Sequence, residues 1–233
     1  MKKTLLLVVL VILFGFGLNA APLFAGQWSD TIFDDGAFSN TITTTGGTDV
    51  LLKYDNISPT WFSMSDTPLS VNDGAGLAYP GADDYIYALR GNNSATFWRY
   101  SVVLNSWSSL TPTPSAILAG GALVSTRNDY LYALRGGGYR SFWRYSISLD
   151  SWTPMTDTPD TASAGAALAY PGTGDYIYAF RGNGSTAFWR YSISGDAWSA
   201  MTAAPSAVSS GGALVSTKND YIYAFKGGST TTF

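Results

Sequence analysis

A segment of seven residues recurs four times along this chain and constrains its fold more than any other feature. The first copy runs from Tyr85 to Gly91, and later copies begin at Tyr130, Tyr176 and Tyr221, at steps of 45, 46 and 45 residues. A fixed period of this length is typical of repeat architectures, in which each unit packs on its neighbours. The sequence therefore predicts four copies of one structural unit.

Two further signals recur in register with this segment. The run Phe-Trp-Arg-Tyr-Ser occupies residues 97–101, 142–146 and 188–192, and a weaker copy occupies 51–55. In every unit a Tyr is followed by a Trp after six intervening residues. The pairs are Tyr54 and Trp61, Tyr100 and Trp107, Tyr145 and Trp152, and Tyr191 and Trp198. We expect these aromatic side chains to be structural and to fill the space between neighbouring units.

Each unit divides into four short strands, because β-branched and aromatic runs alternate with Gly, Asn, Asp, Pro and Ser. The first strand covers the Gly/Ala run, such as Gly120 to Val124, and the second covers the Tyr-Ile-Tyr segment. The third is the Phe-Trp-Arg-Tyr segment, and the fourth begins near the Trp. All 16 acidic residues are Asp. Because Asp favours turns and Glu favours helices, this bias also indicates an all-β fold.

The Tyr-x6-Trp spacing, the Gly-rich strand and the four-strand unit resemble the kelch repeat, over about residues 51 to 233. They look most like the kelch-like repeats of exported bacterial and archaeal proteins and of the galactose oxidase central domain. The resemblance implies a β-propeller of four-stranded blades. One position departs from the family, whose second strand usually closes on two glycines. Here a basic residue replaces the first glycine, at Arg90, Arg135, Arg181 and Lys226.

The repeats begin at a third strand and end after a second strand. The closure known in the kelch family would then build one blade from two strands at each end of the chain. Two alternatives stay open, because kelch propellers usually have six or seven blades: a complete four-bladed ring, or a fragment of a larger ring. We divide the chain into a signal peptide (1–25), an N-terminal cap or degenerate strand segment (26–50), and the propeller repeats (51–233).

The first 25 residues resemble a secretory signal peptide. Lys2 and Lys3 precede an apolar run from Thr4 to Leu18, and small residues follow at Ala20 and Ala25. The run is short for a membrane span, although an uncleaved anchor is the alternative. We therefore expect a secreted or cell-surface protein with no membrane span after removal of this segment.

The composition lacks most of the side chains that commonly carry catalysis. The chain has no His, Cys or Glu, so the commonest general base, thiolate and metal ligand are missing. We predict no catalytic residue, no cofactor and no metal, and the net charge of −3 gives no reason to expect nucleic acid as a partner. An Asp precedes each Tyr-Ile-Tyr segment, at Asp84, Asp129, Asp175 and Asp220. Turn capping is the favoured role of these carboxylates, and calcium binding is the alternative.

The recurring basic residues Arg90, Arg135 and Arg181 are expected to hold blades together through carbonyl, aromatic or Asp partners. The loops between second and third strands are the best binding candidates, because loops on rigid scaffolds carry recognition. Their candidate contact residues are Asn92, Asn93, Tyr139, Arg140 and Asn183. The favoured function is non-catalytic binding of a protein or glycan at this loop face. The alternative is a fragment or domain of a carbohydrate-active kelch-type enzyme, such as an oxidase or a mutarotase.

Overall fold

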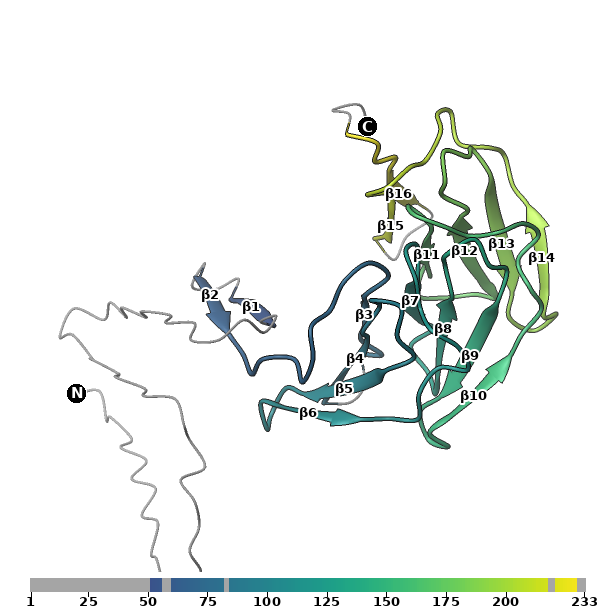
Figure 1. Ribbon diagram of the computed structural model, residues 1–233. Helices are drawn as coiled ribbons and strands as arrows, with labels where there is room; N and C mark the ends of the chain where they lie inside the picture. The colour runs from purple at the N-terminus through teal and green to yellow at the C-terminus, as the bar shows by residue number, and fades with distance from the viewer. Residues whose placement is uncertain (1–50, 56–59, 82–83, 218–220, 230–233) are drawn as a thin grey trace, which may run out of the picture. The chain divides into compact units, whose positions relative to one another are not determined.

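The structure is a computed structural model, and it describes residues 51–55, 60–81, 84–217 and 221–229 (Figure 1). The expected signal peptide (1–25) and the expected cap (26–50) lie outside these residues. The described part of the chain consists of strands and connecting turns and contains no helix. Every strand pairing is antiparallel.

Three consecutive repeats form three complete four-stranded sheets, which we call the first, second and third blades (Figure 1). The first blade contains β3 (Gly76–Ala78), β4 (Tyr85–Leu89), β5 (Phe97–Ser101) and β6 (Ser106–Ser109). The second contains β7 (Ala122–Ser125), β8 (Tyr130–Leu134), β9 (Phe142–Ser146) and β10 (Ser151–Pro154). The third contains β11 (Ala167–Ala169), β12 (Tyr176–Phe180), β13 (Phe188–Ser192) and β14 (Ala197–Ala200). Strands that follow one another in sequence are neighbours in each sheet, which confirms the predicted β-propeller fold of four-stranded blades.

Two half-blades flank the complete ones. The N-terminal hairpin pairs β1 (Leu52–Asp55) with β2 (Thr60–Ser63), and the C-terminal hairpin pairs β15 (Ala213–Ser216) with β16 (Ile222–Phe225). Among the residues that the structure describes, these hairpins are separate two-stranded sheets, so the closing blade that the repeat order suggests is not formed there. Residues 51–55 read Leu-Leu-Lys-Tyr-Asp where complete blades have Phe-Trp-Arg-Tyr-Ser.

The Tyr-x6-Trp spacing is explained by strand register. Tyr145 and Trp152 lie directly opposite each other across the β9–β10 pair. The same pairing joins Tyr54 to Trp61, Tyr100 to Trp107 and Tyr191 to Trp198. Six intervening residues are therefore the length needed to turn from a third strand into a fourth and return to the same level of the sheet.

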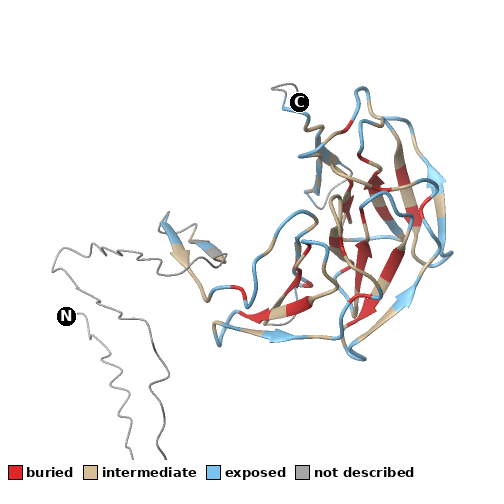
Figure 2. Ribbon diagram, in the orientation of Figure 1, coloured by how far each residue is buried: buried red, intermediate tan, exposed pale blue. Residues whose placement is uncertain are grey.

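The cores lie between blades (Figure 2). Phe97 of the first blade meets two aromatic rings of the second, Tyr145 with centroids 4.9 Å apart and Trp152 with centroids 5.0 Å apart. Phe142 meets Tyr191 and Trp198 of the third blade at 4.8 and 4.9 Å. Edge-to-face rings at these separations attract one another beyond the benefit of buried area. Each blade thus buries its aromatic faces only against its neighbours.

The first strand of each blade starts later than the sequence predicts, because its glycines form a turn. In the second blade the strand begins at Ala122, and Gly120 before it has a φ of +82°. A Cβ at Gly120 would lie 2.0 Å from the carbonyl oxygen of Ser163, in the corresponding turn of the third blade. The glycine is needed for both its φ and this backbone contact. The first strands β3, β7, β11 and β15 contact one another in succession beside these turns.

Candidate functional site

The loops between second and third strands occupy equivalent places in the three complete blades. Each forms an isolated β-bridge with the segment that leads into the next unit: Ser94 with Ile117, Tyr139 with Ala162, and Ser185 with Val208. Each loop also donates an amide to the glycine turn of its own blade, as Gly137 does to Ala119 over 2.8 Å. The loops therefore lie at the same end of every blade and are tied to the next one. We call this surface the loop face.

The three asparagine candidates on the loop face share an unusual backbone conformation. Asn92, Asn93 and Asn183 have φ values of +54°, +51° and +54°, and all three are exposed. Among residues other than glycine, Asn adopts this left-handed conformation at least cost. Turn formation thus accounts for these asparagines without a ligand, although their exposed amides face solvent beside the other loops.

The second blade differs from the others at the bridging position. Ser94 and Ser185 stand there in the first and third blades, and each hydroxyl accepts a hydrogen bond from the amide two residues later, of Thr96 or Ala187. Tyr139 replaces this serine in the second blade. Its ring is 45% exposed and keeps the backbone bridge, but it lacks the short hydroxyl that closes the other loops.

An arginine stacks on Tyr139. The guanidinium carbon of Arg135 lies 3.4 Å from the centroid of the ring, which is a close cation–π contact. The Arg135 Nε also donates to the carbonyl of Ala116 at 3.3 Å, so the cation is held from two sides. Arg90 makes the corresponding bond to the carbonyl of Ser70 at 2.8 Å. Tyr139 is consequently an exposed aromatic ring that packs on a guanidinium whose position is fixed by a hydrogen bond.

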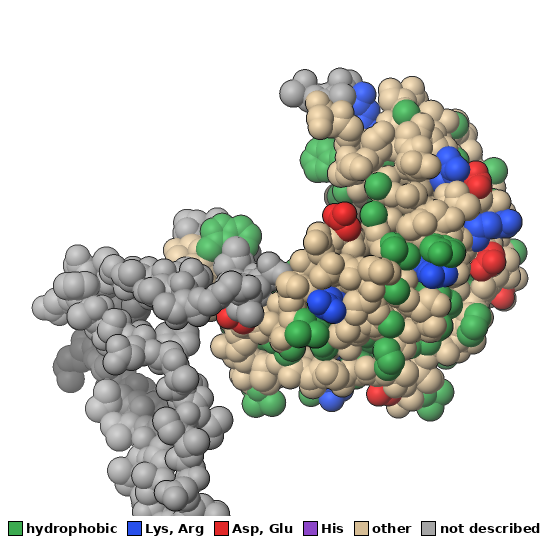
Figure 3. All heavy atoms as spheres, in the orientation of Figure 1, with side chains coloured by type: hydrophobic (Ala, Val, Ile, Leu, Met, Phe, Trp, Pro, Cys, Tyr) green, Lys and Arg blue, Asp and Glu red, His purple; other side chains and the backbone are tan. Residues whose placement is uncertain are grey.

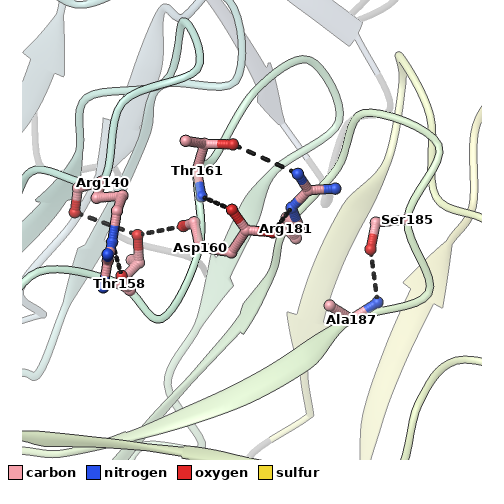
Figure 4. A network of polar contacts seen from close by, with 7 residues as sticks. All are labelled: Arg140, Thr158, Asp160, Thr161, Arg181, Ser185 and Ala187. Atoms are coloured by element: carbon pink, nitrogen blue, oxygen red, sulfur yellow. Dashed lines mark hydrogen bonds and ion pairs between the residues drawn. The ribbon is translucent and has the colours of Figure 1, made fainter.

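Arg140 and Arg181 are joined through the segment that crosses from the second blade to the third (Figure 4). Arg140 donates a hydrogen bond from Nε to the carbonyl of Thr158 at 2.6 Å. In the other direction, the amide of Thr158 donates to the carbonyl of Arg140 at 2.9 Å. Arg181 Nε lies 2.9 Å from an Asp160 carboxylate oxygen. The approach lacks the direction of a hydrogen bond, so the contact is an ion pair. Thr161 Oγ1 accepts from the same guanidinium at 3.4 Å.

A second recurring polar arrangement fastens one blade to the next at their fourth strands. The carboxylate of Asp150 accepts hydrogen bonds from the Tyr145 hydroxyl at 2.6 Å and from the Thr111 amide of the preceding blade at 2.9 Å. Trp152 Nε1 donates to the carbonyl of Thr111 at 3.0 Å. We call this arrangement the interblade clamp. Asp196 repeats it with Tyr191, Thr156 and Trp198, and Asn105 repeats it with Tyr100, Ser65 and Trp107.

The clamp shifts the pKa of its members. Burial raises the pKa of the Tyr145 hydroxyl above its usual range, and donation to Asp150 raises it further. Burial would raise the pKa of Asp150, but the bonds from Tyr145 and Thr111 outweigh it and hold the pKa below its usual range. These shifts follow from interblade packing, which accounts for them without catalysis. Sequence reasoning did not single out Asn105, Asp150 and Asp196, although an Asn or Asp five residues after the motif Tyr of each complete blade was a signal for them.

The acidic residues before the second strands cap neighbouring turns. Asp129 accepts from the Ser146 hydroxyl at 2.6 Å and from the Ser148 amide at 2.8 Å, both at the turn after β9. Asp175 binds Ser192 and Ser194 in the same way. Among the residues that the structure describes, no three His, Cys, Asp or Glu side chains come together as a metal site. Over the same residues, no helix has the length and apolar character needed to cross a membrane.

Charged side chains are scattered among uncharged ones on the face seen in Figure 3. Arg99, Arg144 and Arg190 are held over the rings of Tyr85, Tyr130 and Tyr176, with centroid distances of 4.2, 4.5 and 4.4 Å. Each of these guanidinium groups therefore makes a cation–π contact within its own blade. They do not combine into a basic surface of the kind that binds a polyanion.

No family model matches the sequence, and no curated protein matches it. The fold does match solved structures. The structure of YjhT, a kelch-type propeller, superposes on this chain with a TM-score of 0.57 and 16% sequence identity. The match covers 71% of this chain and 62% of the YjhT chain, so this chain spans less than two thirds of that structure. At this identity the likeness shows a β-propeller fold alone.

Proposed function

We propose that this chain is an exported, kelch-type binding protein that recognises a protein or glycan through the loop face, without catalysis. The observation that carries the proposal is the exposed Tyr139 on its Arg135 support. The repeat offers serine at this position, and serine makes a local hydrogen bond that tyrosine does not make. Tyr and Arg are the residues most enriched at energetic centres of contact surfaces.

The surroundings of Tyr139 favour recognition of a ligand over turnover. The loop is fixed by its bridge to Ala162, so little conformational freedom is lost when a ligand binds. Arg140 is exposed beside it, and its donor groups suit a carboxylate or hydroxyl group. The interblade clamp explains the shifted pKa values of Tyr145 and Asp150. Burial would raise the pKa of Asp129, but hydrogen bonds from Ser146 and Ser148 outweigh it and lower that pKa.

A glycan array probed with the purified chain tests this proposal, with an extracellular protein library as the second arm. We expect a bound class of ligand whose signal falls at least tenfold in Tyr139→Ser. This substitution restores the residue of the other blades and leaves the backbone bridge in place. The matched control is Tyr79→Ala, since Tyr79 is also an exposed tyrosine, at 55% against 45% for Tyr139, but follows β3, at the opposite end of the blade. Equal binding by wild type and Tyr139→Ser would refute the role of the loop face.

A further inference from the structure

The C-terminal hairpin presents an apolar groove that complete blades cover. The groove is lined by Ala213, Leu214, Val215, Tyr223, Ala224 and Phe225. Val215 and Tyr223, which pair across β15 and β16, are 59% and 46% exposed. Tyr132, at the equivalent place in the second blade, is fully buried against the third blade. The C-terminal hairpin thus has the apolar pattern of a blade that packs on a neighbour, yet its strands contain only intermediate and exposed residues (Figure 2).

The same hairpin has a sheet edge that the complete blades use. Each of β4, β8 and β12 pairs on one side with a first strand and on the other with a third strand. In the described part of the chain, β16 pairs with β15 alone. Its sequence repeats that of β12 except for the first residue of the pattern, Tyr221, which lies just before the strand. An edge of this kind is a template for a further strand.

The N-terminal hairpin is the half-blade that fits this edge. It consists of a third and a fourth strand, and its Tyr54 and Trp61 keep the register of the complete blades. Trp61 is 56% exposed, whereas Trp152 and Trp198 are half-buried against the preceding blade's Phe97 and Phe142. The corresponding ring for Trp61 is that of Phe188 in the third blade, which is less buried than Phe97 and Phe142.

We propose that the C-terminal hairpin of one chain binds the N-terminal hairpin of a second copy, so that β15, β16, β1 and β2 complete a blade between two molecules. The register of the complete blades then places Ala224 opposite Leu52 and Tyr223 opposite Lys53. Lys53 occupies the position of Arg190, which lies over the ring of Tyr176, and in the joint it faces the exposed Tyr221. The joint thus gives the C-terminal hairpin what a complete blade has: a third strand paired with β16, burial of its apolar groove, and a cation–aromatic contact.

One observation favours a second copy over the same chain as the source of the hairpin. Among the residues that the structure describes, the two hairpins of one chain form separate sheets. A chain that exposes both halves of one blade makes a head-to-tail contact, which joins copies into a ring or an open array.

The joint has one built-in weakness. In complete blades a serine of the third strand donates to the Asp before the second strand, as Ser146 does to Asp129. Residue 55 replaces this serine with Asp55, and the partner position by sequence is Asp220. An ionised carboxylate at residue 55 cannot donate this hydrogen bond. We expect Asp55→Ser to tighten association roughly 3- to 10-fold, the value of one recovered hydrogen bond.

Sedimentation velocity across a wide range of concentration tests the proposal on the purified chain. We expect the wild type to associate as concentration rises and Asp55→Ser to associate at lower concentration. Val215→Asp blocks one surface and Trp61→Ala weakens the other, so each variant alone stays monomeric. A mixture of the two forms a dimer and nothing larger, because only one intact pair of surfaces remains. A wild type that stays monomeric at every concentration overturns the proposal.

Cross-linking checks the register and the source of the hairpin. The chain has no native cysteine, so single cysteines at Ala224 and Leu52 introduce the only thiols. We expect an oxidised mixture of Ala224→Cys and Leu52→Cys chains to give a covalent dimer. The control replaces Leu52→Cys with Ser63→Cys, which lies one strand further away on β2 and should not react. Equal yields in both mixtures, or cross-linking only within a doubly substituted chain, contradict a joint between copies.

Discussion

Replacing Trp152 by alanine measures how much the interblade contacts contribute to stability. The indole lies 5.0 Å from the ring centroids of both Phe97 and Tyr145, and its Nε1 donates to the Thr111 carbonyl at 3.0 Å. Truncation of a core tryptophan costs about 3–5 kcal/mol. Because Trp152 is half-buried, we expect the lower end, about 3 kcal/mol. About 1 kcal/mol of this is the lost hydrogen bond.

The matched variant is Trp61→Ala, since Trp61 holds the same repeat position but is 56% exposed. Denaturant unfolding at a concentration where chains are separate gives both free energies of unfolding from the midpoint and slope. We expect Trp61→Ala to cost less than about 1 kcal/mol, as for other exposed positions. A Trp152→Ala cost below about 1 kcal/mol, or one equal to that of Trp61→Ala, would show that the packing between blades does not hold the fold together.

Three further predictions follow from the glycine turn and the clamp. Gly120→Ala should abolish cooperative folding or cost several kcal/mol, because its Cβ meets the Ser163 carbonyl at 2.0 Å. Gly138→Ala has a similar φ and no atom within 4 Å of its Cβ, so it should cost only about 1 kcal/mol in the same denaturation assay. Asp150 and Asp196 have folded pKa values below the ordinary value of about 3.9. The stability they give is complete above that value and is lost as the pH falls through the folded pKa, so thermal midpoints should drop below about pH 4. The double substitution of Asp150 and Asp196 to Asn should keep the clamp and reduce this acid loss. An unchanged acid profile would exclude the clamp as its source.

Much of the fold could be predicted because the same pattern of strands and turns recurs four times in the sequence. The Tyr-x6-Trp spacing gave the turn between the third and fourth strands, and the observed pairing of Tyr145 with Trp152 has that register. The start of the first strand was wrong because Gly120 and Gly121 resemble a flexible strand in sequence. Glycine is required at residue 120 because the carbonyl of Ser163 in the next blade lies too close to leave room for a side chain. No local pattern reports a contact made 43 residues away.

The position of the loops between second and third strands could be predicted from the sequence, but the contacts within those loops could not. The repeat pattern predicts that these loops join the second and third strands, and the bridge of Tyr139 to Ala162 places them at one end of the blades. The stacking of Arg135 on Tyr139 was not foreseen, because the two residues belong to different elements of the loop. Asn92 stays a predicted contact residue, and its φ of +54° shows in addition that it suits the turn.

Near-identical repeats make exceptions informative, because each blade is a control for the others. Asn105 replaces Asp150 and Asp196 in the first clamp with the same hydrogen bonds, so this exception changes charge without changing structure. Tyr139 replaces a serine that closes its loop, and Asp55 replaces a serine that binds its neighbouring strand. We propose interaction with another molecule for both: a ligand on the loop face for Tyr139, and a reversible joint between copies for Asp55.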